Sequence, residues 1–212
     1  MTITTPTQAK ILSIKNCRLI LENKILDEAT IVIEDGILTS ISTNGAVPEG
    51  AIDAYGCFVM AGLVDSHSDG LEKEISPRPN VRFDTNYALS SYESRVRAAG
   101  ITTIAHGVGY QDNPKMGRSV EGAKELRKVI LSRASNPDSQ VTHKVLHRIE
   151  ARDEVGVEAL IQDLNSEKHE TNWMVSFEDH TPGQGQYRDR KQFEASVEKH
   201  ELEPGMTVEE YV

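Results

Sequence analysis

The sequence of 212 residues has little cysteine and no long hydrophobic run. Cys17 and Cys57 are the only cysteines, and they form no CxxC pattern. A disulfide framework is therefore excluded, and we expect reduced cysteines that pack in a cytoplasmic protein. No apolar stretch approaches the roughly 18 residues of a membrane span, and Met1–Lys10 lacks the apolar centre of a signal peptide. We expect neither secretion nor membrane insertion.

Positive charge is also scarce, because 23 Lys and Arg face 33 Asp and Glu, for a formal net charge of −10. Nucleic acids and anionic lipid surfaces are normally met by clustered Lys and Arg. The balance therefore argues against both as partners. An acidic chain that handles phosphates needs metal ions and a few well-placed cations.

The first 60 residues have the pattern of a small β domain. Two β-type runs, Ile11–Leu21 and Thr30–Ile41, are accompanied by turn residues at Asn23 and at Asp35-Gly36. We therefore predict an incomplete, sandwich-like β domain over residues 1–60 and a second domain over 61–212.

From residue 61 onward, short apolar runs alternate with helical stretches, which is typical of β/α units with a parallel sheet. Gly100 is placed to end the first long helix, and Ser119 to cap the next. We predict an α/β fold, the first half of a (β/α)8 barrel. Its expected strands are 62–67, 101–106, 141–149 and 173–177, and its expected helices are 86–99, 119–133 and a third from 153 or 154 to 168. The charged tail at 188–200 is also expected to be helical, but it adds no further β/α unit.

Metal-competent side chains follow several of these strands. His67 and Asp69 are two residues apart, and such residues point to the same side of a strand. Glu150 and His180 follow later strands, and functional groups of parallel β/α folds collect at the carboxyl ends of the strands. These donors suit Zn, Mn, Fe or Ni, so we predict a divalent-metal site. The alternative is that His67 and Asp69 only cap a turn.

Other candidates carry less weight. His106 also ends an expected strand, but we interpret it as structural, together with His143 and His147. Residues 107–109 (GVG) have neither the G-x-G-x-x-G spacing nor a P-loop lysine, so a nucleotide cradle is weakly supported there.

The strand with its extension at 62–73, followed by Pro77-Arg78-Pro79, resembles the amidohydrolase superfamily, and within it the enzymes of phosphonate breakdown. Three later stretches fit the same pattern in order: residues 98–103 (AAGITT), 147–150 (HRIE) and 179–184 (DHTPGQ). The resemblance implies hydrolysis of a ribosyl triphosphate, bearing a methylphosphonate at C1, to the 5-phosphate and pyrophosphate.

The resemblance also implies roles for individual residues. His67 and Asp69 would hold one metal, Glu150 would bridge, and His180 would bind a second metal. Such a binuclear centre would activate water. The best candidates for triphosphate contacts are Lys73, Arg78 and Arg188, because cationic side chains match phosphate oxygens.

The length departs from this family. A complete barrel has eight strands, and a further metal-binding His and a catalytic general-base Asp have no counterpart here, so we expect them in an absent C-terminal half. A missed strand between His106 and Arg118 is left open. An open barrel exposes two sheet edges, so we expect a marginally stable chain that depends on a separate C-terminal half, with homo-oligomerisation as a weaker rescue. The alternatives are an inactive remnant or interaction module, or an amidohydrolase acting on a cyclic amide.

Overall fold

The computed structural model describes residues 10–78, 81–112, 117–151, 153–166, 174–181, 183, 185–200 and 205–207. The predicted strand start at Trp173 and helix end at Lys168 lie outside these residues, as do Pro79, Pro182 and Gln184 of the quoted motifs. The chain divides into two compact units, Met1–Ala61 and Gly62–Val212. No helix of the described residues is long and apolar enough to cross a membrane.

The first unit is a β-sheet in the order β3-β2-β1-β4, with β5 also paired to β1. The predicted run Thr30–Ile41 is two strands, because Asp35 and Gly36 adopt positive φ and form the turn of a hairpin. Cys17 is fully buried in the core, as predicted, but Cys57 is exposed, so the prediction that it packs is wrong. The strands are β1 (Ile11–Ile20), β2 (Ile25–Glu34), β3 (Ile37–Ser42), β4 (Ile52–Asp53) and β5 (Phe58–Val59).

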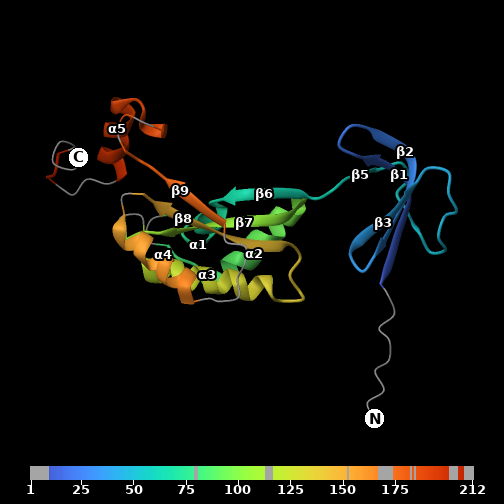
Figure 1. The fold of residues 1–212 in the computed structure, drawn as a ribbon, viewed down its shortest axis with the longest axis horizontal. Helices are drawn as coiled ribbons and strands as arrows, with labels where there is room; N and C mark the ends of the chain where they lie inside the picture. Colours follow the sequence, from blue (N-terminus) through green and yellow to red (C-terminus); the bar gives the residue numbers. More distant parts are fainter. Residues whose placement is uncertain are drawn as a thin grey trace, which may run out of the picture. The chain divides into compact units, whose positions relative to one another are not determined.

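The second unit contains a parallel sheet in the order β6-β7-β8-β9. Helices α2, α3 and α4 lie along one face of this sheet (Figure 1), which confirms the predicted half-barrel of β/α units. The strands are β6 (Leu63–Ser68), β7 (Ile101–Tyr110), β8 (Thr142–Glu150) and β9 (Met174–Glu178). The helices are α1 (Gly70–Ile75), α2 (Thr85–Ala98), α3 (Val120–Ala134), α4 (Glu154–Ser166) and α5 (Arg190–His200).

Local signals explain where these helices begin and end. The side chain of Asp84 accepts a hydrogen bond from the backbone N–H of Tyr87 and caps α2. Gly100, with a φ of +82°, follows the end of the same helix, as predicted for a residue in the left-handed region. Ser119 accepts from the backbone N–H of Gly122 and caps α3, also as predicted.

Strand β7 is longer than the sequence suggested. It continues through Gly107 and Gly109 to Tyr110, and all of these residues are paired in register with β8. His106 therefore lies within a strand and does not end one, and residues 107–109 are strand rather than loop. In the described residues between His106 and Arg118 there is no additional strand.

The alternation of side chains along the strands separates two faces of the sheet. Val108 of β7 and Val145 and Ile149 of β8 are buried in the core formed with the helices, and we call this side the helix face. Gly107, Arg148 and Glu150 alternate with these residues and lie on the opposite side, which we call the open face.

Candidate functional site

His67 and Asp69 form a pair at the carboxyl end of β6. The Nε2 atom of His67 lies 3.6 Å from Oδ1 of Asp69, and both side chains are nearly half exposed. Ser68 between them is buried, and its hydroxyl shares a hydrogen bond of 2.7 Å with that of Tyr92 from α2. The alternation of the strand therefore turns His67 and Asp69 to the open face while Ser68 anchors the strand end to the helices.

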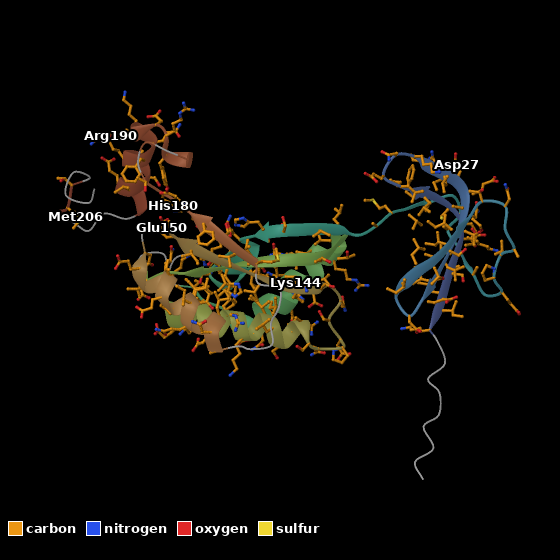
Figure 2. The ribbon with its side chains drawn as sticks, in the orientation of Figure 1. Asp27, Lys144, Glu150, His180, Arg190 and Met206 are labelled. Carbon is orange, nitrogen blue, oxygen red and sulfur yellow. The ribbon has the colours of Figure 1, made fainter. Side chains whose placement is uncertain are left out.

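Glu150 and His180 form a second pair, at the ends of β8 and β9. Nδ1 of His180 is hydrogen-bonded to Oε2 of Glu150, and the backbone N–H of His180 lies 3.4 Å from Oε1 of the same carboxylate. Figure 2 shows both side chains together where β9 leaves the sheet toward α5. The ring of Tyr187 contacts His180 with centroids 5.6 Å apart and meets Phe193 of α5 edge to face.

The structure thus brings the predicted ligands together as two His–carboxylate pairs. Within the described ranges, no three His, Cys, Asp or Glu side chains form a group that could hold one ion. Each pair offers one nitrogen and one carboxylate donor, which fits a divalent metal in chemical type. The shared cation site stays a prediction.

Arg148 was not predicted as a site residue from the sequence. It contacts Asp69 of the first pair and lies two residues before Glu150 of the second pair. Its Nη1 donates to Oδ1 of Asp69 over 2.7 Å, and its Nε and Nη2 donate to the two oxygens of Glu178 over 2.5 and 2.9 Å. Burial alone would lower the pKa of Arg148, but Glu178 and Asp69 outweigh it and raise the pKa. Its position two residues before Glu150 was the available signal, since residues i and i+2 share a face.

Gly107 makes the contact between Asp69 and Arg148 possible. These two residues come from β6 and β8, and β7 lies between them. A Cβ atom at residue 107 would be 2.7 Å from Oδ1 of Asp69 and 2.8 Å from Cδ of Arg148. The glycine therefore leaves the gap through which an ion pair crosses the middle strand.

The predicted triphosphate contacts are all exposed side chains of the second unit. Lys73 belongs to the short helix α1, which the sequence analysis did not predict, and Arg78 follows that helix and forms an isolated β-bridge with Val81. Arg188 follows a 3₁₀ turn at Gly185–Tyr187. No contact with either His–carboxylate pair supports these roles, which stay predictions.

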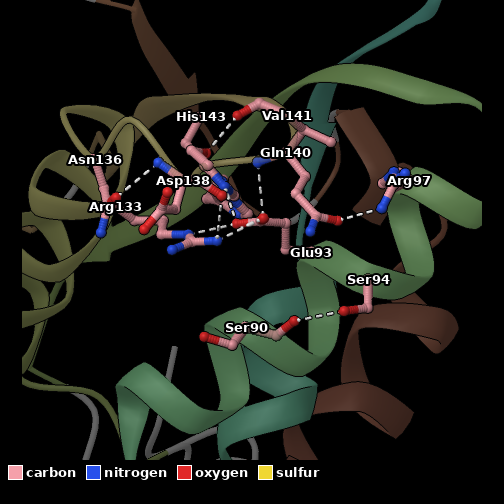
Figure 3. Close-up of polar contacts among 12 residues, drawn as sticks. Ser90, Glu93, Ser94, Arg97, Arg133, Asn136, Asp138, Gln140, Val141 and His143 are labelled. Carbon is pink, nitrogen blue, oxygen red and sulfur yellow. Dashed lines mark hydrogen bonds and ion pairs between the residues drawn. The ribbon is translucent and has the colours of Figure 1, made fainter.

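The helix face carries a contrasting polar network around Glu93 of α2 (Figure 3). Arg133 donates to both of its oxygens over 2.6 and 2.7 Å, and Gln140 N–H and His143 Nε2 each lie 2.9 Å from one oxygen. Burial opposes ionisation of Glu93, but these hydrogen bonds outweigh it and lower its pKa to about 2. The carboxylate is therefore charged and saturated.

This network extends to a second buried histidine. An ionised Glu93 can only accept, so His143 donates to it from Nε2. Nε2 of His106 lies 2.8 Å from Nδ1 of His143. Nδ1 of His106 is buried and has no hydrogen-bond partner among the described residues. Burial, with a contribution from His143, lowers the pKa of His106 to about 3.

All three histidines that we interpreted as structural, His106, His143 and His147, are buried on the helix face. Nε2 of His147 accepts a hydrogen bond from Nε of Arg127, and its Nδ1 donates to the carbonyl oxygen of Met174. Their positions in the core keep them away from the open face.

A cavity of about 460 Å³ lies between α1, α2 and α3. Its charged lining is balanced, and its lining residues include none of the predicted ligands or triphosphate contacts. The charged residues are Arg82, Arg118 and Lys128 against Glu72, Asp84 and Glu125. The cavity belongs to the helix layer and gives no reason to move the candidate site away from the open face.

The sequence was compared with those of known proteins. No family model matches the sequence. Over 183 residues it is 28% identical to a protein of Escherichia coli strain K12, with 85% of this chain and 47% of that protein covered. Over 93 residues it is 39% identical to the L-hydantoinase of Paenarthrobacter aurescens, covering 43% of this chain and 19% of the relative. The chain therefore spans at most about half the length of these curated relatives.

A solved structure gives the same fold. The triazine hydrolase from Arthobacter aurescens superposes with a TM-score of 0.52 at 12% identity, over 90% of this chain and 58% of that one. The chain therefore has the fold of this hydrolase, and its sequence is similar at low identity to two curated relatives that it covers only in part. The Escherichia coli relative that it resembles is the α-D-ribose 1-methylphosphonate 5-triphosphate diphosphatase.

Proposed function

We propose that the chain contributes the first half of the active site of a metal-dependent diphosphatase in phosphonate catabolism, acting in the cytoplasm. The substrate would be a ribosyl methylphosphonate triphosphate, hydrolysed to the 5-phosphate and pyrophosphate. The observation that carries this proposal is the placement of two His–carboxylate pairs at the carboxyl ends of parallel strands. The 28% identity to a diphosphatase supports the choice of substrate.

In this proposal His67 and Asp69 hold one divalent ion, and Glu150 and His180 hold a second. A bound ion would act as a Lewis acid that lowers the pKa of water from about 15.7 to about 7. The carboxylates of Asp69 and Glu150 would also orient the attacking water on the open face. Lys73, Arg78 and Arg188 would neutralise the triphosphate, because an acidic chain otherwise repels it.

The rest of the centre is proposed to come from outside this sequence. The chain covers 47% of the diphosphatase, so a polypeptide corresponding to the remaining length would supply the general-base Asp and a further His. A separate C-terminal half is the preferred partner, and a homo-oligomer the alternative. The open sheet edges would pair with that partner.

The decisive test is pyrophosphate release. The chain is incubated with α-D-ribose 1-methylphosphonate 5-triphosphate and Mn²⁺, alone and with the C-terminal part of the Escherichia coli relative. We expect release only with the metal and the second polypeptide, and a loss of at least about 100-fold in His67→Asn. The control is Arg190→Met, because Arg190 is exposed and, among the described residues, pairs only with Glu194 on α5. A folded, metal-loaded complex without pyrophosphate release would refute the assignment.

A second candidate is hydrolysis of a cyclic amide, which is favoured by the 39% identity to L-hydantoinase over 93 residues. The same preparation is therefore offered a 5-substituted hydantoin under the same conditions. Ring opening of the hydantoin without cleavage of the triphosphate would replace the diphosphatase by this second function.

A further inference from the structure

We propose that Arg148 is a positioning residue, which holds the carboxylate of Asp69 on the open face through one oxygen and leaves the other oxygen for a cation. This rests on the proposed function in so far as Asp69 is taken as a metal ligand. Neither the motif comparison nor the sequence pattern assigns a role to Arg148 or to its partner Glu178.

The guanidinium of Arg148 is itself held in place. Glu178 accepts from Nε and Nη2 in a bidentate arrangement, which fixes the plane of the fork. The side chains of Arg148 and Glu178 are only 13% and 17% exposed, whereas that of Asp69 is 44% exposed. A buried clamp therefore reaches out to a carboxylate that would otherwise move in solvent.

The contacts to Asp69 fall on one atom. Arg148 donates to Oδ1 over 2.7 Å, and Nε2 of His67 lies 3.6 Å from the same oxygen. Oδ2 has no hydrogen bond to any described residue. A carboxylate held in this way presents its second oxygen in a fixed direction, as the partners that orient ligating carboxylates in metal sites do.

The charge of the cluster argues that Arg148 does not replace a metal ion. Asp69 and Glu178 both pair with Arg148, so two carboxylates share one positive charge and this contact cluster keeps one negative charge. The guanidinium therefore leaves an attractive site beside it.

Gly107 provides a way to test the contact without changing any charge. A methyl group at residue 107 would sit between Asp69 and Arg148, while one at Gly109 would meet only Arg118, at an ordinary 3.7 Å. Neither glycine has a positive φ, so alanine can adopt the backbone conformation at both positions and the two variants differ in what the added methyl group meets. Gly107→Ala and Gly109→Ala are therefore a matched pair.

The first experiment titrates the 212-residue chain with Mn²⁺ and follows the free ion by electron paramagnetic resonance. We expect Arg148→Met and Gly107→Ala to weaken binding about tenfold, which is the usual effect of losing a partner of a ligand. Gly109→Ala and the surface variant Arg190→Met are expected to bind as the parent chain does. Unchanged affinity in the first two variants would overturn the proposal, and tighter binding in Arg148→Met would show that Arg148 competes with the ion.

The second experiment needs no metal. A double-mutant cycle of Asp69→Asn and Arg148→Met is measured by urea unfolding, and we expect a coupling of about fivefold in the unfolding constant. Absence of coupling would overturn the proposal that Arg148 positions Asp69, whatever the Mn²⁺ titration shows. If coupling is present but the parent chain binds no Mn²⁺, the Asp69–Arg148 contact is confirmed. In that case both the proposed metal-dependent function and the assignment of this contact to a cation site fail.

Discussion

The two faces of the parallel sheet carry the same kinds of side chain in opposite conditions. On the helix face, Glu93 is 3% exposed and accepts from three different residues. On the open face, the pair of His67 and Asp69 is nearly half exposed, and Oδ2 of Asp69 is left without a partner among described residues. Histidine next to a carboxylate is therefore no sign of function by itself.

Saturation separates the two cases. A buried carboxylate that uses all its acceptor positions stabilises the fold and has nothing left for a ligand. An accessible carboxylate that is held by one oxygen can still bind one. The comparison predicts that changes on the helix face alter stability, whereas changes on the open face alter ion binding.

The largest effect is expected for Glu93→Gln. The substitution removes one charge of a buried network and leaves Arg133 and His143 without their carboxylate, so the free energy of unfolding should fall by about 3 kcal/mol. The measurement is urea unfolding at pH 7. Glu178→Gln on the open face is the matched change, and we expect it to lower the free energy by only about 1 kcal/mol, because Arg148 keeps Asp69. Equal losses would break the comparison.

An intermediate effect is expected for the pH dependence carried by His106. Its pKa is lowered to about 3 in the fold, whereas the unfolded chain takes up this proton near pH 6.5. The unfolded state therefore binds more protons than the folded state as the pH is lowered, and stability decreases by about 1.6 kcal/mol from pH 6.5 to pH 5.

His106→Gln tests this assignment, because an amide can still form a hydrogen bond with Nδ1 of His143 but does not titrate. Urea unfolding at several pH values should give a flatter profile for the variant than for the parent chain. An unchanged profile between pH 6.5 and 5 would assign the dependence to other groups.

The smallest effect on stability is expected for His67→Asn. The side chain is 46% exposed and its contact with Asp69 is open to solvent, so the free energy of unfolding should change by less than about 0.5 kcal/mol. The same variant should bind Mn²⁺ at least about tenfold more weakly. A variant that is strongly destabilised but binds the ion normally would reverse the roles given to the two faces.

In the second unit, the sequence predicted those strands and helix ends that depend on neighbouring residues. The β-branched run at 101–106 and the apolar run at 141–149 are strands, and both are parallel members of one sheet. Gly100 and Ser119 mark helix ends, because a left-handed backbone and an N-cap oxygen each satisfy a specific need of a helix terminus.

Features that depend on distant residues were missed. The expected strand ended at residue 106 because glycine weakens a strand, yet Gly107 lies in β7, where the Asp69–Arg148 pair needs space. That pair joins residues 79 positions apart, and no periodicity within one segment reveals such a contact. The short helix α1 was missed because six residues are too few to establish a helical period.

The aromatic contact between His180 and Tyr187 links the open face to α5. Tyr187 touches the imidazole on one side and Phe193 on the other, and its hydroxyl is 3.1 Å from Oγ of Ser196. A ligand that turns the imidazole must therefore disturb the packing of this helix. Because Tyr187 contacts both His180 and Phe193, a change at the imidazole would be transmitted to α5. A spectroscopic label on an exposed position of α5 would therefore report the binding of a ligand at His180.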